Sequence, residues 1–474
     1  MQFSVASVKL LDFSKGRVGY MSGLISIGMP FFSCVKSYMR GDFCYFINTK
    51  TGTWVALPNY CAKILLDKKC AENQSEQYLK VYEVLAKNSI IRDSRFNPSI
   101  APLEIKPLAV HFQPTGKCNL QCKYCYNDQK IRSKSMSMET MLRAVDYCFE
   151  NPFARKQAPM FLIYGGEPLT ERTLLFELIR YIRSKAEDTY IGVITNATLL
   201  TEDDIIFFKS HNVRIIISFD GLPEFQAKNR HGTTDIAAAD NVLSKLYLLK
   251  KHDYMSGSSV LSVVTKEMSA RLLECVLFLQ DRGVIDLEFL SMNLLGNAQG
   301  MRAISTDITN FITSLKKIVD AIEDGRISRL HMRNILRMLM PLFSKQNIKG
   351  ELGNHRCGAG RNVIAITVDG KILACDMVPE QFHPEIGNVW DGITSLNRFD
   401  KQVAAYASDE CKKCTWLYFC RNGCTGACAS DNGDLNKRHQ LTCATNKEIY
   451  PYLLEKIATD NGKLREYFNE STHL

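Results

Sequence analysis

Between residues 108 and 326 the sequence alternates short apolar runs with longer amphipathic stretches, and this alternation limits the possible folds more than any other feature. The apolar runs, rich in β-branched residues, predict six strands, at 108–113, 160–164, 191–195, 214–219, 260–265 and 286–291. The amphipathic stretches carry apolar residues at helical spacing and predict helices at 137–150, 173–187, 202–210, 235–252, 270–282 and 307–324. Repeated strand–helix units form a parallel sheet, so we predict an α/β fold in which residues 105–326 make a partial (β/α)6 barrel of the TIM type.

Polar motifs follow the first four predicted strands. A cysteine-rich loop follows the first strand and Gly165-Gly166-Glu167-Pro168 follows the second, whereas Asn196 and Asp220-Gly221 follow the third and the fourth. Active sites of βα barrels collect at the carboxyl ends of their strands. We therefore expect the functional site at this end of the barrel.

Three cysteines stand close together in the first of these loops, as Cys118-x3-Cys122-x2-Cys125. Three thiolates on one short loop can bind three irons of a four-iron cluster, which leaves the fourth iron open. Zinc sites more often use two-residue cysteine knuckles in pairs. The spacing therefore favours an iron–sulfur cluster over zinc.

This triplet closely resembles the cluster motif of the radical S-adenosylmethionine (SAM) enzymes. In that family the open iron binds the amino and carboxylate groups of SAM, and reductive cleavage of SAM gives a 5'-deoxyadenosyl radical that abstracts hydrogen from a substrate. The resemblance implies a radical SAM enzyme with SAM and a 4Fe-4S cluster as cofactors. It also implies cofactor contacts for the residues that match other family motifs, which are Tyr124, Gly165, Gly166, Glu167, Asn196, Ser218 and Arg230.

The family pattern gives each matching residue an expected place. Glu167 is expected at the SAM amino group, where the paired glycines let a ligand approach the backbone. Tyr124 is expected near the adenine and Arg230 near the carboxylate of SAM. Asn196 and Ser218 are expected along the ribose and the methionine moiety.

A second group of cysteines lies within residues 327–474, and its spacing resembles that of the SPASM domain. This carboxyl-terminal extension of peptide-modifying radical SAM enzymes carries two auxiliary 4Fe-4S clusters, so the resemblance implies three clusters in all. It assigns the second auxiliary cluster to Cys411, Cys414, Cys420 and Cys443, and the first to Cys357, Cys375 and Cys424. The Cys411-x2-Cys414 knuckle by itself is also typical of zinc.

The chain departs from this pattern at the first auxiliary site. Some relatives place a fourth ligand shortly before the position of Cys357, but residues 348–356 contain no cysteine. The site is therefore expected to be open or to use another ligand, and Cys428 is either a spare thiol or that ligand.

Asp376, directly after Cys375, matches an acid with which anaerobic sulfatase-maturing enzymes deprotonate their substrate. Beside an anionic cluster its proton affinity should rise, which is useful for a catalytic base. The alternative is an ordinary loop aspartate bonded to nearby backbone.

Residues 1–95 follow a different pattern. Strands predicted at 33–38, 43–48 and 53–57 precede helices at 60–67 and 76–87, which is a winged-helix-like order, and a proline-rich linker follows at 97–107. The cysteines here lack ligand spacing and are expected in the core or incidental: Cys34, Cys44, Cys61 and Cys70. Residues 40–67 resemble a peptide-recognition element that binds a leader peptide as an added strand.

Composition excludes several other classes of protein. No apolar run approaches the roughly 18 residues that span a bilayer, and residues 1–15 lack the apolar block of a signal peptide. The chain has 474 residues and 17 cysteines, and an odd number cannot all be paired in disulfides. Many of these cysteines are grouped at the spacing of metal ligands, which favours a reducing compartment over a disulfide scaffold. We therefore expect a cytoplasmic protein that does not enter a membrane.

These patterns lead to one main functional hypothesis and two alternatives. The main hypothesis is an oxidoreductase that matures ribosomally made peptides (a RiPP maturase). It would bind a precursor through its leader, abstract hydrogen from a core residue and form a thioether or carbon–carbon crosslink, with flavodoxin or ferredoxin as electron donor. A sulfatase-type maturase, which makes formylglycine from Cys or Ser, would need no leader-binding module. A nucleic-acid-binding regulator would need a recognition helix rich in Arg and Lys, and residues 60–67 contain only Lys63.

Overall fold

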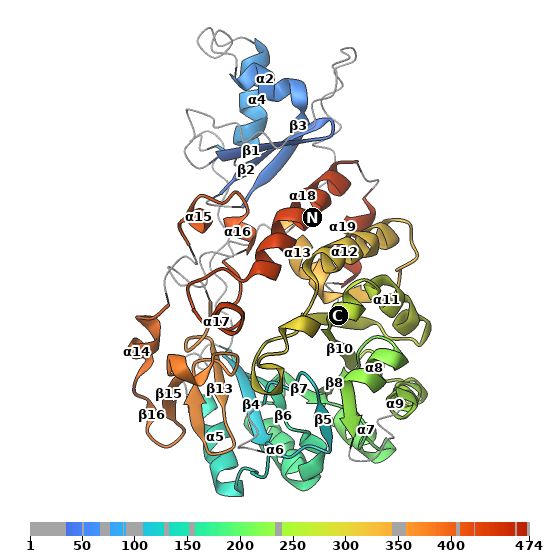
Figure 1. Ribbon diagram of the computed structural model, residues 1–474, viewed down its shortest axis with the longest axis vertical. Coiled ribbons are helices and arrows are strands. Elements are labelled where there is room, and N and C mark those ends of the chain that lie inside the picture. Colours follow the sequence, from blue (N-terminus) through green and yellow to red (C-terminus); the bar gives the residue numbers. More distant parts are fainter. Residues whose placement is uncertain are drawn as a thin grey trace.

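The computed structural model describes residues 35–49, 52–66, 76–88, 90–91, 108–127, 132–150, 157–232, 239–343, 357–403, 408–420, 422–459 and 462–471. A small sheet with two helices lies at one end of the molecule and the barrel lies at the other (Figure 1). Helices of the carboxyl-terminal region lie between them (Figure 1). The predicted linker, Cys34, Cys70 and residues 348–356 lie outside the described residues.

The predicted α/β barrel is confirmed, and its strands lie within two residues of their expected bounds. In sheet order they are β4 (Ala109–Thr115), β6 (Met160–Gly165), β7 (Ile191–Thr195), β8 (Val213–Ser218), β10 (Ser258–Val264) and β11 (Asp286–Ser291), and neighbours run parallel. The helices are α5 (Met138–Glu150), α6 (Arg172–Lys185), α7 (Glu202–Ser210), α9 (Ala239–Lys251), α11 (Leu272–Asp281) and α12 (Ile308–Glu323). Before α9, residues 235–238 of the predicted helix lie outside the described part.

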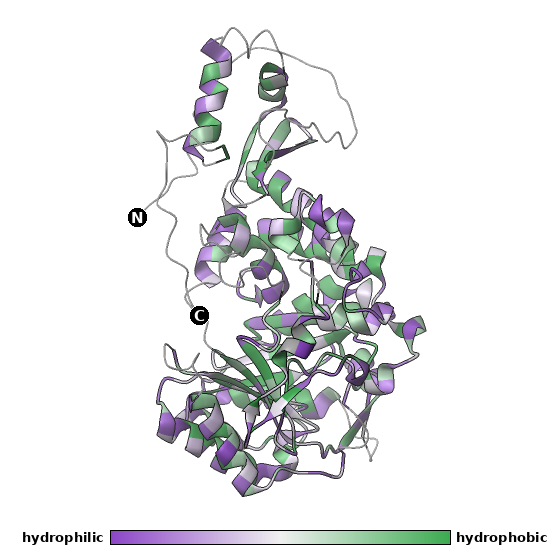
Figure 2. Cartoon of the chain, turned by 90° about the vertical axis from the view of Figure 1, so that its left-hand side faces the viewer, coloured by the Kyte–Doolittle hydropathy of each residue, from purple (hydrophilic) through white to green (hydrophobic). Residues whose placement is uncertain are grey.

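Side chains of the barrel strands alternate between two environments, as a pleated sheet requires. Phe112, Phe161 and Ile163 are fully buried in the main hydrophobic core. His111 and Tyr164, at alternating positions on β4 and β6, instead contact each other edge to face. Figure 2 shows the barrel strands mostly in hydrophobic colours and the surrounding helices with hydrophilic outer surfaces.

The barrel sheet continues into the carboxyl-terminal region, which the sequence did not predict. Strand β13 (Val363–Ile366) pairs parallel with β4, and three antiparallel strands extend the sheet further: β14 (Lys371–Leu373), β15 (Glu385–Asn388) and β16 (Gly392–Ile393). At the opposite edge β12 (His331–Met332) pairs with β11. The cysteine-bearing loop after β14 is thereby attached to the first strand of the barrel.

The amino-terminal module is a three-stranded antiparallel sheet followed by two helices, as expected. The strands are β1 (Val35–Arg40), β2 (Phe43–Asn48) and β3 (Trp54–Pro58), and the helices are α2 (Asn59–Leu66) and α4 (Glu76–Lys87). One face of the sheet packs on these helices in a core that contains Cys44 and Cys61. The prediction that these two cysteines are core residues is confirmed.

The other face of the small sheet packs on the carboxyl-terminal helices α16 (Leu417–Cys420) and α18 (Gln440–Thr459). Tyr38 meets Trp416 edge to face at 5.9 Å, and the indole of Trp54 donates a hydrogen bond of 3.0 Å to the Leu342 carbonyl. A Cβ atom at Gly52 would lie 1.9 Å from the ring of Tyr418, so only glycine fits there. The module is therefore docked on the rest of the protein through apolar contacts.

The carboxyl-terminal region also contains helices α13 (Arg333–Phe343), α14 (Leu396–Asp400), α15 (Asp409–Lys412), α17 (Thr425–Asn432) and α19 (Lys463–Ser471). None of the described helices combines the length and the apolar character that crossing a bilayer requires.

Candidate active site

The loop that carries the cysteine triplet is held against the end of β6. The amide of Gly166 donates to the Thr115 carbonyl at 2.9 Å, and the amide of Glu167 donates to the Lys117 carbonyl at 2.7 Å. A Cβ atom at Gly165 would lie 2.2 Å from the Thr115 carbonyl oxygen, and one at Gly166 would lie 2.0 Å from that of Lys117. We expected the paired glycines to admit a ligand, and in the structure they admit the backbone of the cluster loop.

Glu167 is a buried carboxylate that joins three strand ends. Its Oε1 accepts hydrogen bonds from the Leu169 amide at 3.1 Å and the Thr195 hydroxyl at 2.7 Å, and its Oε2 accepts one from the Asn196 amide at 2.7 Å. Burial raises the pKa of Glu167, and these hydrogen bonds oppose the rise. Because a carboxylate offers about four acceptor sites, one stays available to a ligand.

Asn196 ties the end of β7 to the cluster loop. Its side-chain Nδ2 donates to Oδ1 of the Asn119 side chain at 3.0 Å, and Asn119 Nδ2 donates to the Thr198 hydroxyl at 2.8 Å. Asn119 lies directly after Cys118, so this network fixes the loop next to a ligand candidate. Ser218, which ends β8, is buried two residues before Asp220.

Tyr124 and Arg230 meet at Asp220, a fully buried carboxylate after β8. The Tyr124 hydroxyl donates to Asp220, and the Arg230 guanidinium pairs with it at 3.2 Å while lying 5.4 Å from the centre of the Tyr124 ring. Residues Leu120–Cys122 (β5) also pair antiparallel with Arg230–Gly232 (β9). In this structure Arg230 therefore has a protein carboxylate as its partner.

The three loop cysteines are free thiols. Desolvation raises the pKa of Cys118, and Cys122 and Cys125 both act on it electrostatically in the same direction. Burial raises the pKa of Cys122 while Arg230 opposes the rise, and the neighbouring Cys125 raises it further. No His, Cys, Asp or Glu side chains of the described residues converge in threes on one metal ion. In a four-iron cluster each cysteine binds a different iron, so separated thiols beside a buried cation fit such a cluster.

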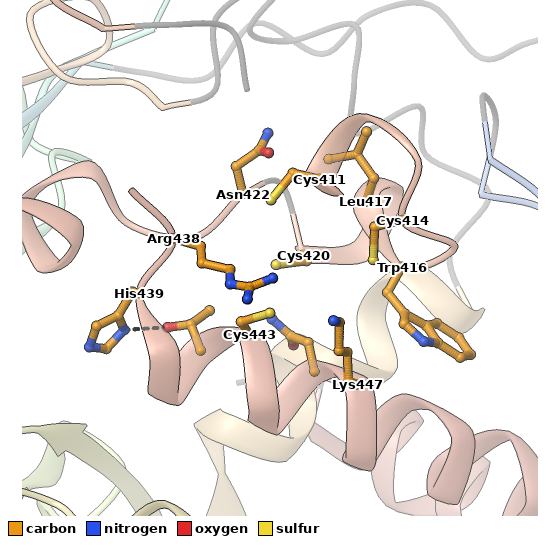
Figure 3. A pocket seen from close by; sticks show the side chains of 12 residues that line it. Cys411, Cys414, Trp416, Leu417, Cys420, Asn422, Arg438, His439, Cys443 and Lys447 are labelled. Carbon is orange, nitrogen blue, oxygen red and sulfur yellow. Dashed lines mark hydrogen bonds between the residues drawn. The ribbon is translucent and has the colours of Figure 1, made fainter. Parts of the chain in front are cut away.

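Four carboxyl-terminal cysteines line one pocket, and they are the set expected for the second auxiliary cluster: Cys411, Cys414, Cys420 and Cys443 (Figure 3). They come from α15, α16, the turn between these helices and the start of α18. Burial raises the pKa of Cys420 to about 11, and the other three thiols contribute to the rise. The pocket thus gathers four sulfur donors, which is the chemistry that an iron–sulfur cluster requires.

Cys357, Cys375 and Cys424 form a separate group. Burial raises the pKa of Cys375, as do Asp376, Cys424 and Cys357 beside it. The Thr425 hydroxyl donates to the Cys357 sulfur at 3.3 Å, which joins α17 to this group. Cys428 is fully buried one helical turn after Cys424.

Asp376 is held by side chains from the barrel. Its Oδ1 lies 2.9 Å from His111 Nδ1, and its Oδ2 lies 3.5 Å from the Tyr126 hydroxyl. Burial raises the pKa of Asp376, but hydrogen bonds from His111 and Tyr164 outweigh it, so that the pKa lies below its ordinary value. These bonds oppose the raised proton affinity that we expected beside a cluster. They also show that Asp376 is more than a loop residue bonded to local backbone.

Comparison with known proteins identifies the family. Residues 112–275 match the model of the Radical SAM superfamily, and they contain the cysteine triplet and the residues around Glu167 and Asp220. The protein is a radical SAM enzyme. A cysteine-type anaerobic sulfatase-maturating enzyme of Clostridium perfringens is 23% identical over 374 residues, which cover 74% of this chain and 97% of the relative.

Two solved structures share the fold of this radical SAM enzyme. Native anSMEcpe with bound AdoMet (SAM) aligns with a TM-score of 0.62 and 22% identity, over 74% of this chain and 98% of that chain. SuiB of Streptococcus suis, bound to its precursor peptide SuiA, aligns with a TM-score of 0.52 and 14% identity, over 85% of this chain and 96% of that chain. The radical SAM family implies SAM and a 4Fe-4S cluster as cofactors of the barrel.

The sequence did not single out several residues that build the site of this radical SAM enzyme. Asp220 was noted only as part of a motif, although its position after a strand end was a usable signal. His111, Tyr126 and Tyr164 were missed as partners of Asp376 because they lie more than 200 positions from it in the sequence. Only the pairing of β4 with β13 brings these positions together.

Proposed function

We propose that this radical SAM enzyme modifies a ribosomally made precursor peptide and forms a thioether or carbon–carbon crosslink at a core residue. The amino-terminal module is the observation that carries the proposal. The alignment with SuiB, solved with a precursor peptide, covers 85% of this chain, whereas the alignment with anSMEcpe covers 74%. A module outside the barrel is required for leader binding and is not required by a sulfatase-type maturase.

The small sheet supports leader binding because its outer strands, β1 and β3, are the edge strands of the described sheet. In the described part of the chain β1 and β3 each pair with β2 alone. The Asn48 amide of β2 donates to the Thr53 carbonyl, so the backbone groups of Thr53 face β2. Backbone groups alternate in direction along a strand, so those of Val55 and Leu57 also face β2. The backbone groups of Trp54 and Ala56 therefore point outward from the sheet. An extended leader would pair with such outward groups.

The residues of the barrel would divide the chemistry among them. When bound, SAM and the cluster supply the 5'-deoxyadenosyl radical that abstracts hydrogen. Cys118, Cys122 and Cys125 would hold the cluster, and the free acceptor site of Glu167 would receive the SAM amino group. Asp376 would take the proton of the attacking substrate group.

The carboxyl-terminal cysteines would hold two auxiliary 4Fe-4S clusters, as in a SPASM domain spanning residues 327–474. Closing the crosslink releases one proton and one electron from the substrate, and cleaving SAM consumes one electron. The electron balance therefore closes without an added oxidant. A flavodoxin or ferredoxin is needed only to supply the first electron.

A sulfatase-type maturase is the second candidate. It is favoured by the sequence relative from Clostridium perfringens, of which 97% is covered, and by the acid at Asp376. Under this alternative the amino-terminal module has no part in substrate binding. The affinity for a leader therefore separates the two functions.

Proline substitutions in the two edge strands test leader binding in the full-length enzyme. Ala56→Pro removes an outward amide of β3, and Met39→Pro removes one of β1, while proline at an outward edge position leaves the ladder to β2 intact. One of the two variants should bind the peptide product of any small open reading frame adjacent to the gene about tenfold more weakly than the wild type, since it loses a backbone hydrogen bond. Fluorescence anisotropy with a labelled precursor measures this.

Point substitutions are preferable to deleting residues 1–95, because deletion would expose Trp416 and Tyr418. Circular dichroism and iron content serve as fold controls for both variants. Unchanged affinity in two correctly folded variants would contradict edge-strand binding and favour the sulfatase-type alternative.

A further inference from the structure

We propose that Lys447 and Arg438 raise the reduction potential of a cluster bound by Cys411, Cys414, Cys420 and Cys443. This would make the second cysteine set the more easily reduced of the two auxiliary sites. The inference rests on the proposed cluster content. Under this inference, side chains of this pocket determine which auxiliary cluster receives the electron released from the substrate.

Lys447 places an unneutralised cation at the pocket. It lines the pocket together with the four cysteines, and Figure 3 shows its side chain rising from α18 toward Cys414. Burial raises the pKa of Cys414, and Lys447 is one of the groups that lower it, so the cation acts on this sulfur. Among the described residues no carboxylate pairs with Lys447.

Arg438 supplies a second cation, and this one is partly neutralised. Figure 3 shows its guanidinium pointing between Cys420 and Cys443. The same guanidinium pairs with Glu410, whose side chain is largely exposed. Glu410 therefore weakens the effect of Arg438 on the pocket, and its removal should strengthen that effect.

Neutral donors act in the same direction as the cations. The Ser408 hydroxyl donates to the Cys411 sulfur at 3.3 Å, the Trp416 amide donates to Cys414, and the Asn446 side chain donates to Cys420. Hydrogen bonds to the sulfurs and nearby positive charge both stabilise the more negative, reduced form of an iron–sulfur cluster. At the other auxiliary site the carboxylate of Asp376 lies 3.7 Å from the Cys375 sulfur, which places a negative charge beside that cysteine.

The test is a redox titration of the full-length, reconstituted enzyme followed by electron paramagnetic resonance. Lys447→Gln should lower the equilibrium constant for reduction of one cluster about tenfold, which is about 59 mV for a one-electron couple. Glu410→Gln should shift the same component in the opposite direction. Lys447→Arg keeps the charge and should leave the titration unchanged. Addition of SAM alters only the signal of the barrel cluster, which identifies the other two components.

Metal analysis separates failure of the inference from failure of the proposed cluster content. Zinc at the four cysteines of the wild type would overturn the cluster content and the inference together. Two results would overturn the inference alone. One is an unchanged reduction potential in a Lys447→Gln variant that holds a full set of clusters. The other is a shift of the reduction potential in the same direction in Lys447→Gln and in Glu410→Gln. If the Lys447→Gln variant loses iron, the Glu410→Gln variant still tests the inference, because it changes only an exposed side chain. The direction in which its reduction potential shifts then decides between the outcomes.

Discussion

Replacing Cys118, Cys122 and Cys125 together by alanine should reduce the cleavage of SAM to the level of a reaction without enzyme. The reason is that the cluster of a radical SAM enzyme supplies the electron, and these cysteines are its only ligand candidates on the loop between β4 and α5. Formation of 5'-deoxyadenosine with dithionite, measured by liquid chromatography, gives the result without a substrate peptide.

A matched control for this variant is Cys148→Ala. Cys148 is a fully buried core residue of α5 and belongs to none of the ligand groups, so this variant should keep both its iron and its SAM cleavage. The triple variant should keep the carboxyl-terminal clusters, because the three groups share no cysteine. SAM cleavage at the wild-type rate in the triple variant would remove the loop from the mechanism.

Gly166→Ala should lower SAM cleavage by roughly 100-fold, the order of effect that a displacement of about 1 Å has on a reacting group. The added Cβ atom would lie 2.0 Å from the Lys117 carbonyl oxygen and 2.4 Å from that of Gly116. Both contacts are with backbone, which cannot rotate away as a side chain can. The chain immediately before Cys118 must therefore move, and the measurement is again 5'-deoxyadenosine formation.

Gly300→Ala controls for the loss of a glycine as such. Gly300 has a φ of +85°, and an added Cβ atom would meet nothing within 4 Å. That variant should lose about 1 kcal/mol of stability from backbone strain and keep its SAM cleavage. If Gly166→Ala cleaved SAM as fast as Gly300→Ala, the close contact between the turn after β6 and the cluster loop would not be needed for SAM cleavage.

The barrel was predictable because each strand is long enough to show an apolar run and each helix is long enough to show its period. The extension of the sheet was not, because β12, β14 and β16 have only two or three residues each. Such short runs carry no pattern that separates them from loops. The place of β12 is determined by its pairing with β11, and β14 and β16 extend the sheet beyond β13, which pairs with β4 in a long-range contact.

The same contrast holds for the site. The resemblance to the SPASM domain grouped Cys411, Cys414, Cys420 and Cys443, and these four cysteines line one pocket in the structure. Contacts between distant segments stayed hidden, as between His111 and Asp376 or between Tyr38 and Trp416. The contact between the glycine pair and the cluster loop stayed hidden for the same reason, since the sequence does not show that the Lys117 carbonyl lies against Gly166.

The most direct test of peptide crosslinking is the mass of the product. The wild-type enzyme is incubated anaerobically with SAM, dithionite and the peptide product of any small, Cys-rich or repeat-bearing open reading frame adjacent to the gene. For each crosslink the peptide should lose the mass of two hydrogen atoms, and one molecule of 5'-deoxyadenosine should form. Asp376→Asn should still cleave SAM but leave the precursor unmodified. A peptide in which a cysteine thiol or serine hydroxyl has become an aldehyde would instead contradict crosslinking and identify a formylglycine-forming maturase.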